Sequence, residues 1–357
     1  MDADAYHGRN VLSRMTISMN RVAKHQNARW CIVLAGGEGM RMRSWIHAWF
    51  GGERPKQYCT FVGSRSMLQH TLDRAHRIVS DGHVVTVIGK DHGKHFSEST
   101  RMQALDLVLE QPDNLGTAPG MFFPTAYVLA DNPEAIVAFL PSDHFVHPEH
   151  LFCEQITEAY ELVEKYKSKI LLVGAVPDRA ETEYGWIDPV RDSGHGNADK
   201  AHKVMNIVRF REKPDVREAQ ALFQQDCLWN TMVMVVKAKI LWDLGRQCLP
   251  EMMYIFDAFL MVLRAIGEKR LESKFEMAAL ARVYKDLQPA DFSRDILQHI
   301  SERSMVMPME DVVWCDWGHP QRVAATLSDI GRHPSFETRQ IGQTEETENA
   351  ITERDNK

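Results

Sequence analysis

Short continuous apolar segments recur along the sequence, and this pattern constrains the fold more than any other feature. Residues 66–79 and 156–167 lie between such segments and place apolar side chains on one face at helical spacing. The apolar segments have the length and β-branched content of strands buried on both faces, and they lie at residues 30–35, 84–89, 105–110, 135–140 and 169–176. Strands that alternate with helices are joined by right-handed crossovers. The sequence therefore predicts an α/β fold with a doubly wound, mainly parallel, Rossmann-like sheet.

The later part of the sequence is predicted to be helical. Between residues 237 and 300 apolar side chains recur at helical spacing. We interpret this segment as a helical C-terminal elaboration of one domain that spans residues 30–332. Residues 1–29 lack the apolar core of a signal peptide and are interpreted as a flexible N-terminal arm. The polar, mostly acidic residues 333–357 are interpreted as a disordered tail.

Two polar motifs follow predicted strands at the edge of the sheet where ligands bind. In a doubly wound sheet this edge lies beyond the carboxyl ends of the strands. The motif GGEGMR at residues 36–41 offers glycines that let a ligand approach the backbone and N–H groups that attract anions. The second motif is PSDH at residues 141–144. Arg41, Arg43 and the segment RPKQY at residues 54–58 add cations of the kind that bind phosphate. Together these features predict a polyphosphate-binding site.

Other glycine-rich phosphate motifs fit this sequence less well. The loop lacks the GK[ST] ending of a P-loop, which argues against a Walker-type ATPase. Met42 stands where the dinucleotide-binding fingerprint has its third glycine, which argues against an oxidoreductase. A glycine-rich turn without a ligand is the remaining alternative, and the neighbouring arginines and lysine argue against it.

Charge and cysteine content argue against several other functions. The net charge is −7, so no general basic surface for nucleic acid is expected. The six cysteines contain no close pair, which argues against a zinc knuckle or a disulfide framework and fits reduced thiols in the cytoplasm. No apolar run approaches the roughly 18 residues of a membrane span. His144, His147 and His150 suggest a zinc site as an alternative, but Pro148 interrupts the helical spacing that such a site would use.

A set of motifs in a fixed order carries a family resemblance. The motifs are LAGGEGMRMR…RPKQY (34–58), EQP…GTAPG (110–120), LPSDH (140–144), EYGWI (183–187), REKPD (211–215), LWNTMV (228–233) and WCDWGHPQRV (314–323). With this set the sequence resembles the sugar-1-phosphate nucleotidylyltransferases, and in particular their mannose-1-phosphate guanylyltransferase branch. The resemblance implies a nucleotidyltransferase sheet. It also implies attack of a sugar-1-phosphate oxygen on the α-phosphorus of a nucleoside triphosphate (NTP), with pyrophosphate leaving.

The resemblance implies roles for four charged residues. Arg41 would contact the triphosphate and steady the departing pyrophosphate, and Lys56 would reach phosphate oxygens around the reacting centre. Asp143 and Asp316 would hold Mg²⁺, which prefers carboxylate and phosphate oxygens, with Asp311 as a nearby competitor. As alternatives, Arg41 would be a solvated surface arginine, and Asp143 or Asp316 would cap a turn or a helix.

The resemblance also implies two binding regions. Nucleotide-binding residues would be Leu34, Ala35, Gly36, Gly37, Gly39, Gln111, Gly116 and Thr117. The sugar 1-phosphate would be bound by Gly185, Glu212, Lys213 and Asn230. Glu212 and Asn230 would hydrogen-bond the sugar hydroxyls, and Lys213 would hold the phosphate. As an alternative, Glu212 and Lys213 form an ordinary solvated ion pair.

The sequence departs from the family pattern in three places. Leu115 and Gly116 stand where arginine and asparagine are usual, and this departure leaves the choice of base open. Met40 replaces the usual threonine. An insertion before the RPKQY segment carries Trp45 and Trp49, and it would form a lid or pack against a partner.

The resemblance favours Mg²⁺-dependent transfer from GTP to mannose 1-phosphate, which would give GDP-mannose. Two alternatives stay open. One is the same chemistry with another NTP or another sugar 1-phosphate, such as glucose 1-phosphate. The other is a catalytically silent regulator that binds nucleotide or nucleotide sugar. The expected location is the cytoplasm, without a nucleic-acid or membrane partner, and a homodimer stays open as the assembly.

Overall fold

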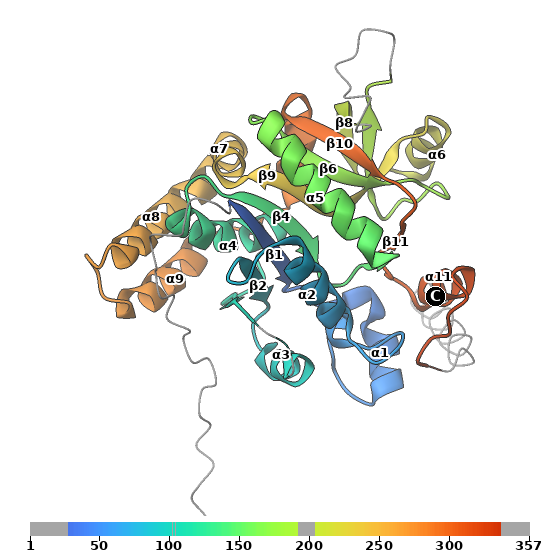
Figure 1. The fold of residues 1–357 in the computed structure, drawn as a ribbon, viewed down its shortest axis with the longest axis horizontal. Coiled ribbons are helices and arrows are strands. Elements are labelled where there is room, and N and C mark those ends of the chain that lie inside the picture. The colour runs from blue at the N-terminus through green and yellow to red at the C-terminus, as the bar shows by residue number, and fades with distance from the viewer. Residues whose placement is uncertain (1–27, 102, 104, 192–203, 337–357) are drawn as a thin grey trace, which may run out of the picture.

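The computed structural model describes residues 28–101, 103, 105–191 and 204–336 (Figure 1). In this part of the chain the main sheet has nine strands in the order β3-β2-β1-β4-β9-β6-β10-β8-β7. Its strands are β1 (Arg29–Ala35), β2 (Val84–Ile88), β3 (Leu107–Glu110), β4 (Ile136–Pro141), β6 (Ile170–Ala175), β7 (Gly185–Pro189), β8 (Met205–Glu212), β9 (Leu228–Lys237) and β10 (Ser304–Met309). All five predicted strands are confirmed.

The sheet is parallel in one half and mixed in the other. Strands β3, β2, β1 and β4 pair in parallel, as predicted, and β10 pairs in parallel with β6. Strand β9 lies between β4 and β6 and is antiparallel to both, and β7 and β8 add further antiparallel pairs. The predicted mainly parallel arrangement therefore describes the half of the sheet that β3, β2, β1 and β4 form. The antiparallel pairs come from β7, β8 and β9, which were not among the predicted strands.

Helices cover both faces of the sheet, which confirms the doubly wound α/β class (Figure 1). Cys31 and Val33 of β1 pack with the face that carries α2 (Met67–Ile78), α3 (Gly93–Thr100) and α5 (Glu149–Lys165). Trp30 and Ile32 point to the opposite face, which carries α4 (Thr117–Asp131). Ser66 caps α2 with a capping box that it forms with Gln69, so the helix begins where the apolar pattern does.

The C-terminal helical elaboration packs on α4. It contains α7 (Ala238–Cys248), α8 (Pro250–Gly267), α9 (Lys274–Asp286) and the short α10 (Phe292–Asp295). The Phe122 ring of α4 lies 6.0 Å from Trp242 and 6.3 Å from Phe256, measured between ring centroids. These helices therefore share one core with the sheet. Helix α6 (Val216–Gln224) packs on the other face.

The aromatic insertion forms helix α1 (Arg43–Phe50), and it packs inside this chain. Trp45 is buried, and its ring lies 4.6 Å from Phe336 and 6.2 Å from Phe61. Helix α11 (Pro320–Asp329) completes the same small core through Val323 and Leu327. Trp45 thus serves as a core residue of this chain, and Trp49 is partly buried against the same cluster.

The predicted termini fall largely outside the described residues. Residues 1–27 of the expected arm and 337–357 of the expected tail lie beyond them. At the boundaries, Arg29 begins β1 and Phe336 is buried against helix α1. No helix in the described ranges is long and apolar enough to cross a membrane.

Candidate functional site

The glycine loop after β1 is held by a short 3₁₀ turn, Lys56–Tyr58. The Gln57 amide nitrogen donates to the carbonyl oxygens of Ala35 and Gly37, at 2.8 Å each. Gly39 has a φ of 62°, and a Cβ at this position would lie 3.0 Å from the Lys56 Cβ. Both the positive φ and the close approach favour glycine there. The loop and Lys56 are therefore one packed unit.

Lys56 joins the two predicted metal-binding aspartates. Its Nζ lies 2.8 Å from Asp143 Oδ2 and donates to the Asp316 backbone oxygen at 2.5 Å. The aspartates come together because a small sheet pairs β5 (Phe145–His147) with β11 (Val313–Cys315), and Phe145 is the register partner of Cys315. Asp143 precedes β5 and Asp316 follows β11, so the ladder places both at the same end.

Arg41 reaches the same cluster from the end of the glycine loop. Its guanidinium donates to Asp316 Oδ2 at 2.7 Å and to Glu183 Oε2 at 2.9 Å. Burial opposes ionisation of Asp316, but Lys56, the Tyr184 hydroxyl and Arg41 together hold its pKa well below the usual range. The structure thus brings Arg41, Lys56, Asp143 and Asp316 into one site.

Asp143 is also held in its charged form. Burial raises its pKa, but the Lys56 ammonium and His144 outweigh that effect and lower the pKa below its ordinary value. The Asp143 side chain is 36% exposed, whereas that of Asp316 is 7% exposed. Asp143 is therefore the more accessible carboxylate of the pair.

Several residues of this cluster were not predicted from the sequence. Asp316 Oδ1 accepts from the Tyr184 hydroxyl at 2.5 Å, from the Gly318 N–H at 3.0 Å and from Arg322 at 3.0 Å. Burial and the neighbouring Asp316 raise the pKa of Tyr184. Tyr184 and Arg322 both lie within motifs of the resemblance, EYGWI and WCDWGHPQRV. Both are polar residues close in sequence to a predicted site residue, and this proximity could have identified them as members of the site.

The predicted nucleotide-binding residues form a second group along the loop. Gly36 lies directly against the Gln111 amide, whose Oε1 accepts from the Tyr284 hydroxyl at 3.3 Å. Thr117 begins α4, and its Oγ1 accepts from the Phe292 N–H at 2.8 Å. Leu34 and Ala35 end β1, while Gly37 and Gly39 continue the loop. These contacts place Gln111 beside the glycine loop and tie Thr117 to α10.

Three of the four predicted sugar-binding residues come together on neighbouring strands. Gly185 of β7 is the register partner of Glu212 of β8. A Cβ at Gly185 would lie 2.8 Å from Glu212 Oε2 and 3.2 Å from the Asn230 Cβ. The Lys213 side chain is 65% exposed, and its Nζ lies 3.9 Å from Glu212 Oε1. Since Tyr184 precedes Gly185, this group adjoins the Asp316 cluster.

A family model described as nucleotidyl transferase matches residues 30–332. The chain belongs to the nucleotidyl transferase family. The matched range includes every predicted site residue.

Known relatives agree with this assignment. The xanthan biosynthesis protein XanB of Xanthomonas campestris pv. campestris (strain B100) is 28% identical over 295 residues, which cover 80% of this chain and 57% of XanB. A mannose-1-phosphate guanylyltransferase of Klebsiella pneumoniae is 26% identical over 211 residues, covering 58% of this chain and 42% of that protein. This nucleotidyl transferase chain thus spans less than two thirds of the curated relatives that it matches.

A solved structure supports the fold. The crystal structure of a protein described as mannose-1-phosphate geranyltransferase from Thermus thermophilus superposes with a TM-score of 0.67 at 22% sequence identity. The match covers 84% of this chain and 79% of that one. It confirms the α/β architecture of this nucleotidyl transferase.

The side chains present fit Mg²⁺ better than zinc. Mg²⁺ is usually bound by one or two carboxylates together with substrate phosphates and water. Asp143 and Asp316 would supply those carboxylates, and Lys56 lies between them, with contacts to the Asp143 carboxylate and to the Asp316 backbone oxygen. In the described ranges, no group of three or more histidine, cysteine, aspartate or glutamate side chains is arranged to hold a metal ion. His144 instead packs edge-on against Trp314, with ring centroids 5.2 Å apart.

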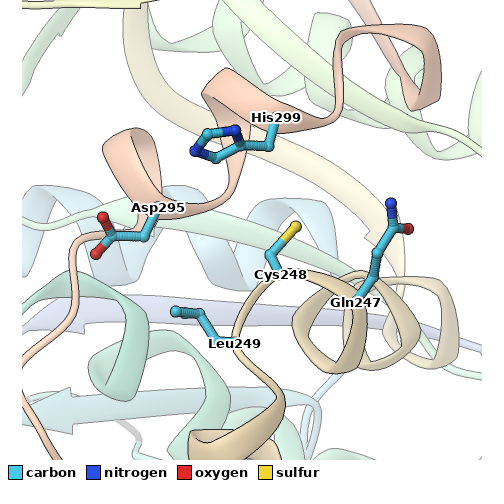
Figure 2. Close-up of a pocket in the computed structure, with 5 residues that line it drawn as sticks. All are labelled: Gln247, Cys248, Leu249, Asp295 and His299. Atoms are coloured by element: carbon cyan, nitrogen blue, oxygen red, sulfur yellow. The ribbon is translucent and has the colours of Figure 1, made fainter.

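A separate cavity lies outside this site. It has a volume of about 420 Å³ and is lined by Gln247, Cys248, Leu249, Asp295 and His299 (Figure 2). None of these is a predicted site residue. Asp295 Oδ2 accepts from the Asp291 N–H, and Asp291 in turn accepts from Thr117. The cavity is therefore connected to Thr117 through the hydrogen bonds of Asp291 and Asp295.

Gly116→Ala should destabilise the nucleotide-binding segment. Gly116 has a φ of 94°, and a Cβ there would lie 2.5 Å from the Ala290 carbonyl oxygen. We expect a loss of about 1–3 kcal/mol in the free energy of unfolding, measured by urea titration. Gly63→Ala is the control, because its φ is 68° but no atom lies within 4 Å of the added Cβ. Equal losses in the two variants would show that the contact with Ala290 contributes nothing.

Glu212 should make stability depend on pH. Burial, followed by the nearby Asp291, raises its pKa from 4.5 to about 7. A raised acid pKa means that the folded state binds the proton more tightly than the unfolded state. The stabilisation is therefore complete below the unfolded pKa and is lost as the pH rises through about 7. Over this window we expect the free energy of unfolding to fall by about 3 kcal/mol more in the wild type than in Glu212→Gln. Urea titrations of both proteins between about pH 5 and pH 8 measure this difference, and parallel curves would contradict it.

Proposed function

We propose that this chain transfers a nucleotidyl group from an NTP to a hexose 1-phosphate. The observation that carries the proposal is the convergence of Arg41 and Lys56 with Asp143 and Asp316 beyond the carboxyl ends of β1 and β4. Two polyanionic substrates repel each other, so a site that joins them needs fixed positive charge and carboxylates for a divalent cation. This site offers both.

In this reaction an oxygen of the sugar 1-phosphate bonds to the α-phosphorus. The bond from the α-phosphorus to the oxygen that bridges to the β-phosphorus breaks, and pyrophosphate leaves with that electron pair. Arg41 would exchange its contacts with Glu183 and Asp316 for the triphosphate, which its 44% exposed side chain permits. Lys56, buried beside the loop, would stabilise charge on phosphate oxygens as the α-phosphorus becomes pentacoordinate.

The two aspartates would hold Mg²⁺. Bound there, the ion supplies positive charge that neutralises phosphate oxygens and orients them. The protein's own part is to keep both carboxylates ionised and close together. The low pKa values of Asp143 and Asp316 serve the first requirement, and the β5–β11 ladder serves the second.

GTP and mannose 1-phosphate are the proposed substrates, with GDP-mannose as the product. The names of relatives such as the Klebsiella mannose-1-phosphate guanylyltransferase support this choice. Glu212 and Asn230 would bind the sugar hydroxyls beside Gly185, and Lys213 would reach the sugar phosphate. We place the reaction in the cytoplasm, in keeping with six cysteines that all remain free thiols.

A substrate matrix tests the proposal. The protein is incubated with each NTP, each of several hexose 1-phosphates and Mg²⁺, and released pyrophosphate is measured. We expect the highest kcat/KM with GTP and mannose 1-phosphate. A higher kcat/KM with another NTP or another hexose 1-phosphate would support the same reaction with different substrates. Absence of pyrophosphate release from every pair would refute the enzymatic proposal, and a thermal shift by nucleotide sugar without turnover would favour the silent regulator.

A further inference from the structure

Arg322 is the most highly connected cation beside the candidate site. One guanidinium nitrogen donates to Asp316 Oδ1 at 3.0 Å and to the Tyr184 hydroxyl at 2.8 Å. The other donates to Glu181 Oε2 at 2.7 Å and to Glu183 Oε2 at 2.9 Å. The guanidinium also lies 5.1 Å from the centroid of the Tyr184 ring. A planar fork that contacts four oxygens fixes the relative positions of their side chains.

The backbone of Arg322 is itself anchored. Arg322 lies in the first turn of α11, whose N-terminus directly follows the Asp316–His319 segment. Val323 and Leu327 of the same helix are fully buried against the core that contains Trp45 and Phe61. The Arg322 side chain is only 16% exposed. A side chain anchored in this way holds its partners in place.

The two carboxylate oxygens of Asp316 have different partners. Oδ1 accepts from Tyr184, Gly318 and Arg322, which occupy it with three donors. Oδ2 accepts from Arg41, whose side chain is 44% exposed. Because Arg41 lies on the loop that would face the triphosphate, Oδ2 is the oxygen that is exposed when Arg41 moves.

Glu183 is a shared partner of Arg322 and Arg41, so Arg322 affects how firmly Arg41 is held. The Glu183 carboxylate accepts from Arg41 and from Arg322, at 2.9 Å each, and from His319 at 3.0 Å. Arg41 and Arg322 contact the same Glu183 oxygen, and their like charges repel each other, so each is held less firmly than it would be alone. Loss of Arg322 would strengthen the hold of Glu183 on Arg41.

We propose that Arg322 is a positioning residue of the nucleotidyl-transfer site. It fixes Asp316 through Oδ1 and Tyr184, so that Oδ2 is aimed at a divalent cation, and it competes for Glu183, so that Arg41 is free for the triphosphate. The inference rests on the proposed function and assigns a role to a residue that is not among the proposed substrate-binding residues. Partners that orient a metal-binding side chain typically change metal affinity by about 10- to 100-fold.

Binding of Mn²⁺ provides the direct test, measured without and with inorganic pyrophosphate, which gives Arg41 a phosphate to contact; pyrophosphate without protein is the blank. Absence of Mn²⁺ binding to the wild type under both conditions would overturn the proposal. Free Mn²⁺ is measured by electron paramagnetic resonance during titration of the wild type, Arg322→Gln and Arg322→Lys. We expect both variants to bind Mn²⁺ about 10- to 100-fold more weakly, because the lysine ammonium restores the charge without the fork. Arg209→Gln is the matched control, since Arg209 pairs with the buried Asp188 outside the site, and it should bind as the wild type does.

A second variant separates positioning from folding. Arg322→Gln leaves the buried Glu181 with one arginine partner fewer, which is expected to lower the melting temperature. The double variant Glu181→Gln/Arg322→Gln removes that carboxylate charge and should recover the melting temperature while Mn²⁺ affinity stays low. Recovery of both would mean that Arg322 acts only on stability, and unchanged Mn²⁺ affinity in Arg322→Gln would also overturn the proposal.

Steady-state kinetics supply a further readout. In Arg322→Gln the KM for the NTP should rise by a larger factor than kcat falls, since Arg41 is then held by Glu183. A fall in kcat alone would contradict this part of the inference. If the wild type releases no pyrophosphate from any substrate pair, the proposed function fails, whereas the Mn²⁺ titration still decides whether Arg322 orients Asp316.

Discussion

Asp143→Asn should lower kcat/KM by at least about 100-fold, because loss of the proposed metal ligand should cost no less than loss of an outer partner. The protein should stay folded but lose stability, because the buried Lys56 ammonium loses its carboxylate partner. The substitution keeps the shape of the side chain and removes its charge. The Lys56 ammonium and His144 hold the pKa of Asp143 low against the effect of burial, so the carboxylate is charged at neutral pH. Pyrophosphate release measures the activity, and a thermal melt checks the fold.

The control for this variant is Asp243→Asn. Asp243 lies on α7 and pairs with Arg246 through Nη1 at 3.2 Å, so it loses the same charge outside the site. Its activity should stay within about twofold of the wild type, as is typical of surface substitutions. If Asp143→Asn kept the activity of Asp243→Asn, then Asp143 would not hold the cation.

The sequence predicts the parallel half of the sheet well because of how such strands are buried. Strands covered on both faces consist of continuous apolar residues, as β1, β2 and β4 do. The β8 strand instead carries exposed Arg209 and Arg211 among buried residues, so its pattern is weaker. The β9 segment is apolar, but an apolar run has the same pattern whether its neighbours are parallel or antiparallel. Its position between β4 and β6 is therefore decided by tertiary pairing.

The local sequence pattern also does not determine which side chains pair with one another in the site. The motifs identify Arg41, Lys56 and the two aspartates as charged residues that need partners, but they do not show which partner each one takes. Arg322 and Glu183 are 139 positions apart and meet because Arg322, in the first turn of α11, reaches the residues that precede β7. Their charges look like those of solvated surface residues in the sequence. Contacts between distant segments are the information that a local pattern lacks.

Lys56→Met should also inactivate the protein, and it should destabilise it as well. The Lys56 side chain is 4% exposed, and its ammonium lies between Asp143 and the Asp316 backbone oxygen. Methionine fills a similar volume without the charge. Removing one preorganised electrostatic contact at a reacting centre typically costs about 10²- to 10³-fold in kcat. We expect a loss of that size, measured by pyrophosphate release at saturating substrate.

The loss of stability should be moderate. Breaking a buried ion pair by removing one partner costs about 3–5 kcal/mol when the remaining charge is sealed from water. Asp143 is 36% exposed, so water solvates its carboxylate and the cost should be smaller than that range. Urea titration measures the cost. Lys169→Met is the control, because its Nζ donates to Asn206 rather than to a carboxylate.

The double variant Lys56→Met/Asp143→Asn separates the two effects of the lysine. If Lys56 stabilises the fold mainly by neutralising Asp143, then the double variant should be more stable than Lys56→Met, because no unpaired carboxylate charge remains at position 143. Its activity should stay as low as that of either single variant, since both the cation for the phosphates and the carboxylate for the metal are gone. Additive losses of stability would show that the two side chains act independently. Retained activity in Lys56→Met would mean that the ammonium only pairs with Asp143 in the protein without substrate and takes no part in nucleotidyl transfer.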